Sequence, residues 1–231
     1  MNLISHFYLD REHPESLYFV GIATPDLVSV YDRKTRLKAA NLPLIMENES
    51  TREQMSFYNG ILRHFEVDAL FHSSEFFQTE TQLLARQLKD TFGDNQVKRS
   101  FFVAHILLEL ILDRILILKD SELLFSFYKH FQNKDILKLV YFTEWACKRP
   151  LPGYAAFLWK FAEKKFLYNY TEWEYLVKVM ENLLQKVGIQ HNTYLHDVRF
   201  IQQLEIYQEG LTERYPTALR TLSSKLMEIP Y

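Results

Sequence analysis

The stretch GILRHFEVDALFH, residues 60–72, places His64, Asp68 and His72 four residues apart along an apolar segment. Residues four apart on an α-helix lie about 6 Å apart along its axis, on nearly the same face. His64 and Asp68 can therefore share one ion, and so can Asp68 and His72, whereas the two histidines are about 12 Å apart and cannot. The stretch predicts a helix that carries a pair of metal ligands.

A second stretch, AHILLELILDR, repeats this spacing with His105, Glu109 and Asp113. Its other residues are almost all apolar, so the polar stripe is narrow. A buried carboxylate is costly unless it is paired or bound to a metal. Imidazole is a good ligand for zinc, iron, manganese and nickel, and carboxylates suit harder ions. Two helices of this kind can hold a divalent ion inside a helical fold.

Each stripe also has a structural interpretation, which the sequence leaves open. The first carries Arg63 and Glu66 as well, and could be the solvated face of its helix. The second could form an ion-pair network with Arg114. A histidine in an apolar setting, such as His6 in NLISHFYL, is often a hydrogen-bonded core residue. Asp26, which follows a proline in GIATPDL, fits turn chemistry.

The composition predicts a globular helical protein. The chain has 231 residues, of which 48% are hydrophobic and 15% aromatic, enough for a sizeable core. Its net charge of −2 argues against disorder and against a general nucleic-acid surface. Gly and Pro are scarce, and apolar residues recur at helical intervals. We expect an all-α single-domain bundle of about 8–10 helices, with a metal-site half over about residues 1–118 and further helices over about 119–231.

Several helix boundaries follow from caps and breakers. A helix that begins near Ser16 should end near Pro25, because proline disfavours helix in the residue before it. Residues 33–49 should form a loop. Thr171 and Glu174 have capping-box spacing, and Gly188 should end the helix that they start. Further helices are expected over about 50–72, 74–92, 96–118, 121–130 and 134–148, with others after residue 153.

No targeting or membrane segment is expected. The N-terminus lacks a basic start and a continuous apolar run. The run VAHILLELILDRILIL contains His, Glu, Asp and Arg, so it predicts a buried helix and not a bilayer segment. A single cysteine, Cys147, excludes an internal disulfide and fits a small buried residue. A cytoplasmic protein is the expectation.

Four segments occur in an order that resembles the acyl carrier protein phosphodiesterase family, which is related to the HD-type metal phosphohydrolases. They are MNLISHFYL, GIATPDL, GILRHFEVD and ELILDRIL, and they cover mainly residues 1–118. The resemblance implies hydrolytic release of phosphopantetheine from acyl carrier protein, with a divalent ion as cofactor. Manganese is the first choice, and iron, zinc or magnesium are alternatives. Acyl carrier protein or another phosphodiester substrate is the implied partner.

The resemblance also implies roles for particular residues. The implied metal ligands come from all four segments: His6, Asp26, His64, Asp68, Glu109 and Asp113. The implied catalytic residues, which would activate water, steady the phosphate or protonate the leaving group, are Asp68, His72, His105 and Arg114.

The sequence departs from the family at several positions. The family often has basic residues after the histidine, where this chain has Phe65 and Glu66. It has Thr-Asp where this chain has Phe71 and His72, and a histidine where this chain has Arg114. These changes weaken the case for docking an acidic carrier protein, which would need a positive face. They leave a second hypothesis, a non-catalytic helical relative that acts as a binding protein.

Two other signals are weaker. A literal His-Asp pair, His196 and Asp197, has no partner set nearby in sequence, and adjacent helical residues point about 100° apart. We expect a surface or helix-start pair. A ferritin-like di-iron protein would need Glu-x-x-His spacings on paired helices, which the chain lacks.

Overall fold

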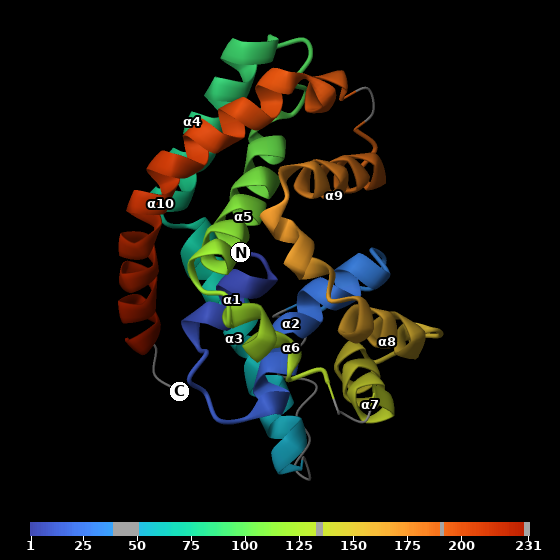
Figure 1. The fold of residues 1–231 in the computed structure, drawn as a ribbon. Helices are drawn as coiled ribbons and strands as arrows, with labels where there is room; N and C mark the ends of the chain where they lie inside the picture. Colours follow the sequence, from blue (N-terminus) through green and yellow to red (C-terminus); the bar gives the residue numbers. More distant parts are fainter. Residues whose placement is uncertain (39–50, 133–135, 190–191, 229–231) are drawn as a thin grey trace. The chain divides into compact units, whose positions relative to one another are not determined.

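The computed structural model describes residues 1–38, 51–132, 136–189 and 192–228. All regular elements within these ranges are helices, which confirms the all-α prediction (Figure 1). None of the described helices is both long enough and apolar enough to cross a bilayer.

The chain divides into two compact units, each assembled from two separate stretches. The first unit contains Met1–Ala69 and Asp120–Leu167, and the second contains Leu70–Lys119 and Tyr168–Tyr231. The chain passes between the two units after Ala69, after Lys119 and after Leu167. The passage after Lys119 coincides with the boundary expected near residue 118. The prediction of a single domain remains a prediction.

The first unit is built from the helices at the N-terminus and in the middle of the chain. These are α1 (Leu3–Leu9), α2 (Ser16–Tyr31), α3 (Arg52–His72) up to Ala69, α6 (Leu123–Tyr128), α7 (Ile136–Cys147) and α8 (Tyr154–Lys164). An aromatic core joins α1, α2 and α6, where Phe7 makes edge contacts with Phe19 and Phe127. All three rings are buried, so this core fixes where α1 lies against α2.

The second unit contains α10, the longest of the described helices. These are the last turn of α3, α4 (Glu75–Phe92), α5 (Ser100–Lys119), α9 (Trp173–Lys186) and α10 (Val198–Met227), with the 3₁₀ turns η2 (Phe166–Thr171, in part) and η3 (Thr193–His196). Helices α4 and α5 pack side by side, and α10 packs against both (Figure 1). Most of α5 from Leu107 to Ile117 is buried, as predicted for this apolar run.

Two predictions about helix ends are wrong. Helix α2 does not end near Pro25 but continues to Tyr31. An internal proline removes one backbone hydrogen bond and costs about 3 kcal/mol. Residues on both sides of it, including Ile22 and Leu27, are buried, and this packing outweighs the local cost. Thr171 does not cap α9 either, because it is the last residue of η2 and Glu172 occupies the N-cap position of α9.

Other signals are confirmed. Gly93 ends α4 with a φ of +87°, a backbone conformation that favours glycine. The His-Asp pair is a helix start, since Asp197 caps α10 by accepting a hydrogen bond from the Arg199 backbone. Part of the loop expected over 33–49 lies outside the described residues.

Candidate metal centres

Two glycines let α2 and α3 cross at very short range in the first unit. A Cβ atom at Gly60 would overlap the Tyr18 carbonyl oxygen, and one at Gly21 would overlap the Phe57 carbonyl oxygen. The two backbones can approach so closely only because both side chains are absent. This crossing brings the next turn of α3, with His64, against the turn of α2 that follows Gly21.

A backbone carbonyl group of α2 determines which ring nitrogen of His64 carries the proton. The ring Nδ1 lies 3.0 Å from the Ile22 carbonyl oxygen. Burial, with a smaller contribution from neighbouring His6, holds the pKa of His64 well below its usual 6.5, so the ring is neutral near pH 7. A carbonyl oxygen can only accept, so Nδ1 carries the proton and Nε2 keeps its lone pair.

That lone pair faces two carboxylates. His64 Nε2 lies 3.5 Å from Asp68 Oδ2 and 4.0 Å from Asp26 Oδ1. A lone pair that faces anionic oxygens is unfavourable unless a cation or a proton lies between them. A backbone carbonyl that orients an imidazole in this way is also the usual support of a metal-bound histidine.

His6 completes a set that we call the His–Asp cluster: His6, Asp26, His64 and Asp68. Its ring stacks on His64 with centroids 4.1 Å apart, and its Nε2 lies 3.1 Å from Asp68 Oδ1. One ligand atom each of His6, Asp26 and His64 lies within 4.8 Å of the others. Three consecutive helices, α1, α2 and α3, therefore supply the cluster.

The charge of Asp68 is strongly stabilised. Burial alone would raise the pKa of its carboxyl, but the hydrogen bond from His6 and the charge of the Met1 amino group hold this pKa well below its usual value. The Met1 amino group donates to Asp68 Oδ1 at 2.7 Å. Asp68 is thus a carboxylate near neutral pH.

The cluster has an apolar inner side and a solvent-facing side. The side chains of His6 and His64 are only 1% and 3% exposed, whereas those of Asp26 and Asp68 are 31% and 28% exposed. The solvated-face interpretation of the first stripe is therefore wrong for His64. Arg63 is not a solvated residue either, because it forms a two-pronged ion pair with Asp10. A ligand from solvent would approach the cluster past the carboxylates.

In the second unit, His105 and Glu109 of the second stripe lie close to His72, the last residue of α3. We call His72, His105 and Glu109 the His–Glu cluster. Nε2 of His72 and Nε2 of His105 lie 2.9 and 3.1 Å from the same oxygen, Glu109 Oε1. Burial alone would raise the pKa of the Glu109 carboxyl, but the hydrogen bonds from His105 and His72 contribute to holding it well below its usual value. One ligand atom of each residue lies within 4.8 Å of the others.

The other two predicted site residues on α5 are placed differently. Asp113 is completely buried. The Arg114 guanidinium donates to Gln208 Oε1 and to the Thr171 carbonyl oxygen, and it lies 4.2 Å from the centre of the Trp173 ring. Burial lowers the pKa of Arg114. These contacts fit a residue that ties α5 to α9 and α10, and its catalytic role remains a prediction.

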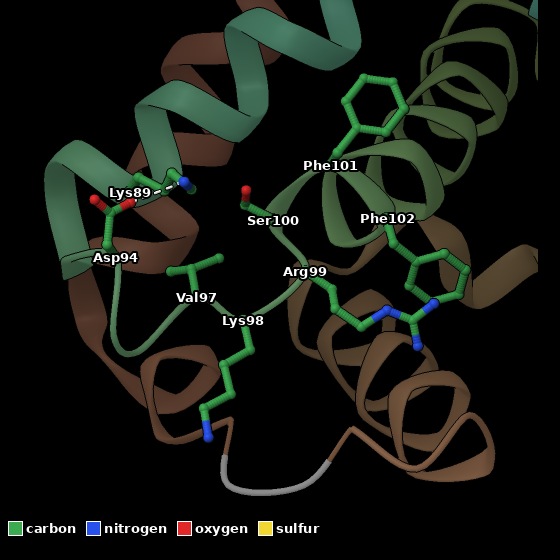
Figure 2. Close-up of a pocket in the computed structure, with 8 residues that line it drawn as sticks. All are labelled: Lys89, Asp94, Val97, Lys98, Arg99, Ser100, Phe101 and Phe102. Atoms are coloured by element: carbon green, nitrogen blue, oxygen red, sulfur yellow. Dashed lines mark ion pairs between the residues drawn. The ribbon is translucent and has the colours of Figure 1, made fainter.

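Two further features lie outside the clusters. Burial raises the pKa of the Cys147 thiol to about 11, so this cysteine is protonated and a poor nucleophile. A surface pocket of about 500 Å³ lies between the end of α4 and the start of α5. Figure 2 shows its Lys89–Asp94 ion pair, with Lys98 pointing away from it and the Arg99 guanidinium against Phe102. No predicted site residue lines this pocket.

Sequence reasoning named the ligand side chains but missed what positions them. Gly21 and Gly60 are the supporting residues of the His–Asp cluster, together with the Ile22 carbonyl group. A signal was present, because both glycines lie inside apolar helical runs, where glycine costs helix stability and so calls for a packing reason. The choice of the Ile22 carbonyl as the partner of His64 has no sequence signal.

Comparison of the chain with protein-family models, with curated proteins and with solved structures found no match. No similar protein from these comparisons therefore assigns a role to the residues of the two clusters.

Proposed function

We propose that this protein is a divalent-metal-dependent phosphodiester hydrolase whose metal ligands are the His–Asp cluster. One observation carries the proposal: neutral His64 turns an unprotonated Nε2 toward the carboxylates of Asp68 and Asp26. A divalent ion among the three groups would stabilise that arrangement.

The donor set fits such an ion. Two imidazoles and two carboxylates suit manganese, iron or zinc, and their mixture of nitrogen and oxygen disfavours calcium and magnesium. A divalent ion held there supplies a Lewis acid for a phosphoryl oxygen and lowers the pKa of a water molecule. The buried histidines exclude solvent on the inner side. The partly exposed Asp26 and Asp68 leave the other side open to a substrate, and the Asp68 carboxylate can orient an attacking water by accepting a hydrogen bond from it.

Phosphodiester chemistry, and phosphopantetheine on acyl carrier protein as the substrate, come from the sequence resemblance described above. The His–Asp cluster supports both proposals, because its four residues lie in three of the segments that carry the resemblance. Glu109, which the resemblance places among the ligands, pairs with His72 and His105 in the second unit.

The test is Mn²⁺-dependent cleavage of a generic aryl phosphodiester, together with Mn²⁺ binding by equilibrium dialysis. His64→Ala and Asp68→Ala should each lose more than about 100-fold in activity and one equivalent of Mn²⁺. His196→Ala is the matched control, since His196 is an exposed histidine that also faces a carboxylate, that of Glu181. It should keep both properties.

If His64→Ala retains wild-type Mn²⁺ binding and activity, the proposal fails. Release of phosphopantetheine from holo-acyl carrier protein tests the substrate separately. Cleavage of the aryl diester without that release would reject the carrier protein as substrate and keep the hydrolase.

The contact of the Met1 amino group with Asp68 favours a second candidate, a non-catalytic binding protein. In that case a fixed positive charge already balances one carboxylate, and the cluster is structural. This candidate predicts that wild-type protein binds no Mn²⁺ at the cluster and cleaves no diester with any added divalent ion.

A further inference from the structure

The His–Glu cluster lies outside the proposed hydrolase site and has the features of a second metal centre. Two histidines from different helices aim the same ring atom, Nε2, at one oxygen of Glu109. A carboxylate oxygen can accept two hydrogen bonds, so these contacts alone also fit a hydrogen-bond network. The feature that points to an ion is that one ligand atom of each of the three residues lies within 4.8 Å of the others.

The separations match those between neighbouring ligands of one ion. With bonds of about 2.1 Å, two ligands at a right angle lie about 3.0 Å apart, and two in a tetrahedral arrangement about 3.4 Å apart. The measured N–O separations are 2.9 Å for His72 and 3.1 Å for His105. An ion could thus be bound with small rotations of side chains that already face one another, with each Nε2 proton released or moved to Nδ1.

Local structure holds this arrangement in place. His105 and Glu109 are one turn apart on α5 and share a face. His72 is the last residue of α3, and Ser74 caps α4 directly after it by accepting a hydrogen bond from the Phe77 backbone. The cap fixes Phe77, whose ring makes edge contacts with the rings of both His72 and His105.

The cluster is also open to solvent on one side. The side chains of His72 and His105 are 32% and 33% exposed, and that of Glu109 is 18% exposed. An ion can enter without unfolding, and coordination positions away from the protein stay open to water or to a small ligand. Two histidines and one carboxylate with open positions form the set that late first-row divalent ions favour.

We propose that His72, His105 and Glu109 form a second, solvent-accessible site for a divalent transition ion such as Fe²⁺, Co²⁺, Ni²⁺ or Zn²⁺. The proposal does not rest on the hydrolase proposal, because none of its three residues belongs to the His–Asp cluster. It arises where the chain departs from the pattern of the family that it resembles, since His72 stands at one of those departures.

Titration with Co²⁺ tests the site, because the visible absorption of this ion reports nitrogen and oxygen ligands directly. Equilibrium dialysis gives the stoichiometry in the same samples. Glu109→Gln and His72→Gln should each lose one equivalent of Co²⁺ and its absorption band, with affinity at that site lowered at least about 100-fold. Glutamine keeps the size and a hydrogen-bonding group, so both variants are expected to fold, which helical circular dichroism checks.

Two controls locate the loss. His196→Gln removes a histidine that also faces a carboxylate in the same unit and should bind Co²⁺ like the wild type. His64→Ala should leave the band of the His–Glu cluster intact. If Glu109→Gln and His72→Gln bind Co²⁺ with wild-type stoichiometry and spectrum, the cluster is a hydrogen-bond network only and the inference is overturned.

Discussion

The two clusters use the same side-chain chemistry in different surroundings. In the His–Asp cluster the imidazoles are almost fully buried, whereas in the His–Glu cluster they are about one-third exposed. The first is assembled from three helices and depends on a backbone crossing at two glycines. The second depends on one turn of α5 and on the connection between α3 and α4, where Ser74 caps α4. The buried cluster is therefore coupled to the close helix crossing in its unit, whereas the exposed cluster needs only the contact between the end of α3 and one turn of α5.

The largest effect is expected from a substitution at Gly60, which allows the close crossing of α2 and α3 that supports the buried cluster. Gly60→Ala places a methyl group on the Tyr18 carbonyl, and we expect a loss of about 3 kcal/mol in the free energy of unfolding. Mn²⁺ binding at the His–Asp cluster should fall with it, because α2 and α3 must move apart. Urea denaturation and dialysis measure the two effects.

Gly210→Ala is the control for this substitution. Its new methyl group would meet only Nη1 of Arg214, the end of a flexible side chain, at 2.8 Å. The Arg214 guanidinium is paired with Glu80 and must shift slightly, and alanine is the better helix former, so we expect a net change within about 1 kcal/mol of zero. If both alanine variants have equal stability, the close crossing of α2 and α3 is wrong.

The next effect concerns Arg114 on α5, and it distinguishes a structural role of this residue from a catalytic one. Arg114→Lys removes the forked contacts to Gln208 and Thr171 and the stacking on Trp173, and should cost about 2 kcal/mol of stability. If the residue is structural, kcat for the aryl diester stays unchanged at temperatures where the variant is folded. A large fall in kcat without loss of stability would restore its predicted catalytic role.

A third effect uses the buried, neutral state of His64. Its pKa in the folded protein is well below 6.5, so only the unfolded chain takes up this proton as the pH falls below about 6.5. Stability contributed by the neutral ring is present above that pH and is lost below it, by up to about 1.4 kcal/mol per pH unit. Denaturation in the presence of a chelator, from pH 7 to pH 5, measures the slope.

His64→Gln removes the titrating group and should reduce this slope by about 1 kcal/mol per pH unit. His196→Gln, at an exposed position, should keep the wild-type dependence. An unchanged slope in His64→Gln would show that the ring is not held neutral in the folded protein.

The smallest effect tests whether packing orients the exposed cluster. Phe77→Leu keeps an apolar side chain but removes the edge contacts to His72 and His105. We expect Co²⁺ affinity at the His–Glu cluster to fall about 5-fold, at a stability cost below about 1.5 kcal/mol. Phe101→Leu, a half-exposed position in the same unit, is the control and should change neither value.

The sequence predicted the local features of the fold well where one helix decides them. The apolar run of α5, the glycine stop at Gly93 and the helix start at Asp197 all follow from periodicity and capping. The predicted end of α2 near Pro25 was wrong because burial on both sides of the proline outweighs its local cost. The predicted cap at Thr171 was wrong because η2 extends through Thr171 and α9 begins one residue later than a cap at Thr171 requires.

The spacing of residues along one helix determined by itself that His64 pairs with Asp68 and that His105 pairs with Glu109, because four residues are about one helical turn. Only the tertiary structure decided the partners from elsewhere: His6 and Asp26 for the first pair, and His72 for the second. The tautomer of His64 was decided in the same way, by a carbonyl group on another helix. Helix periodicity is a short-range property of the chain, whereas these partners depend on how closely two backbones pack, and in the first unit two missing side chains set that distance.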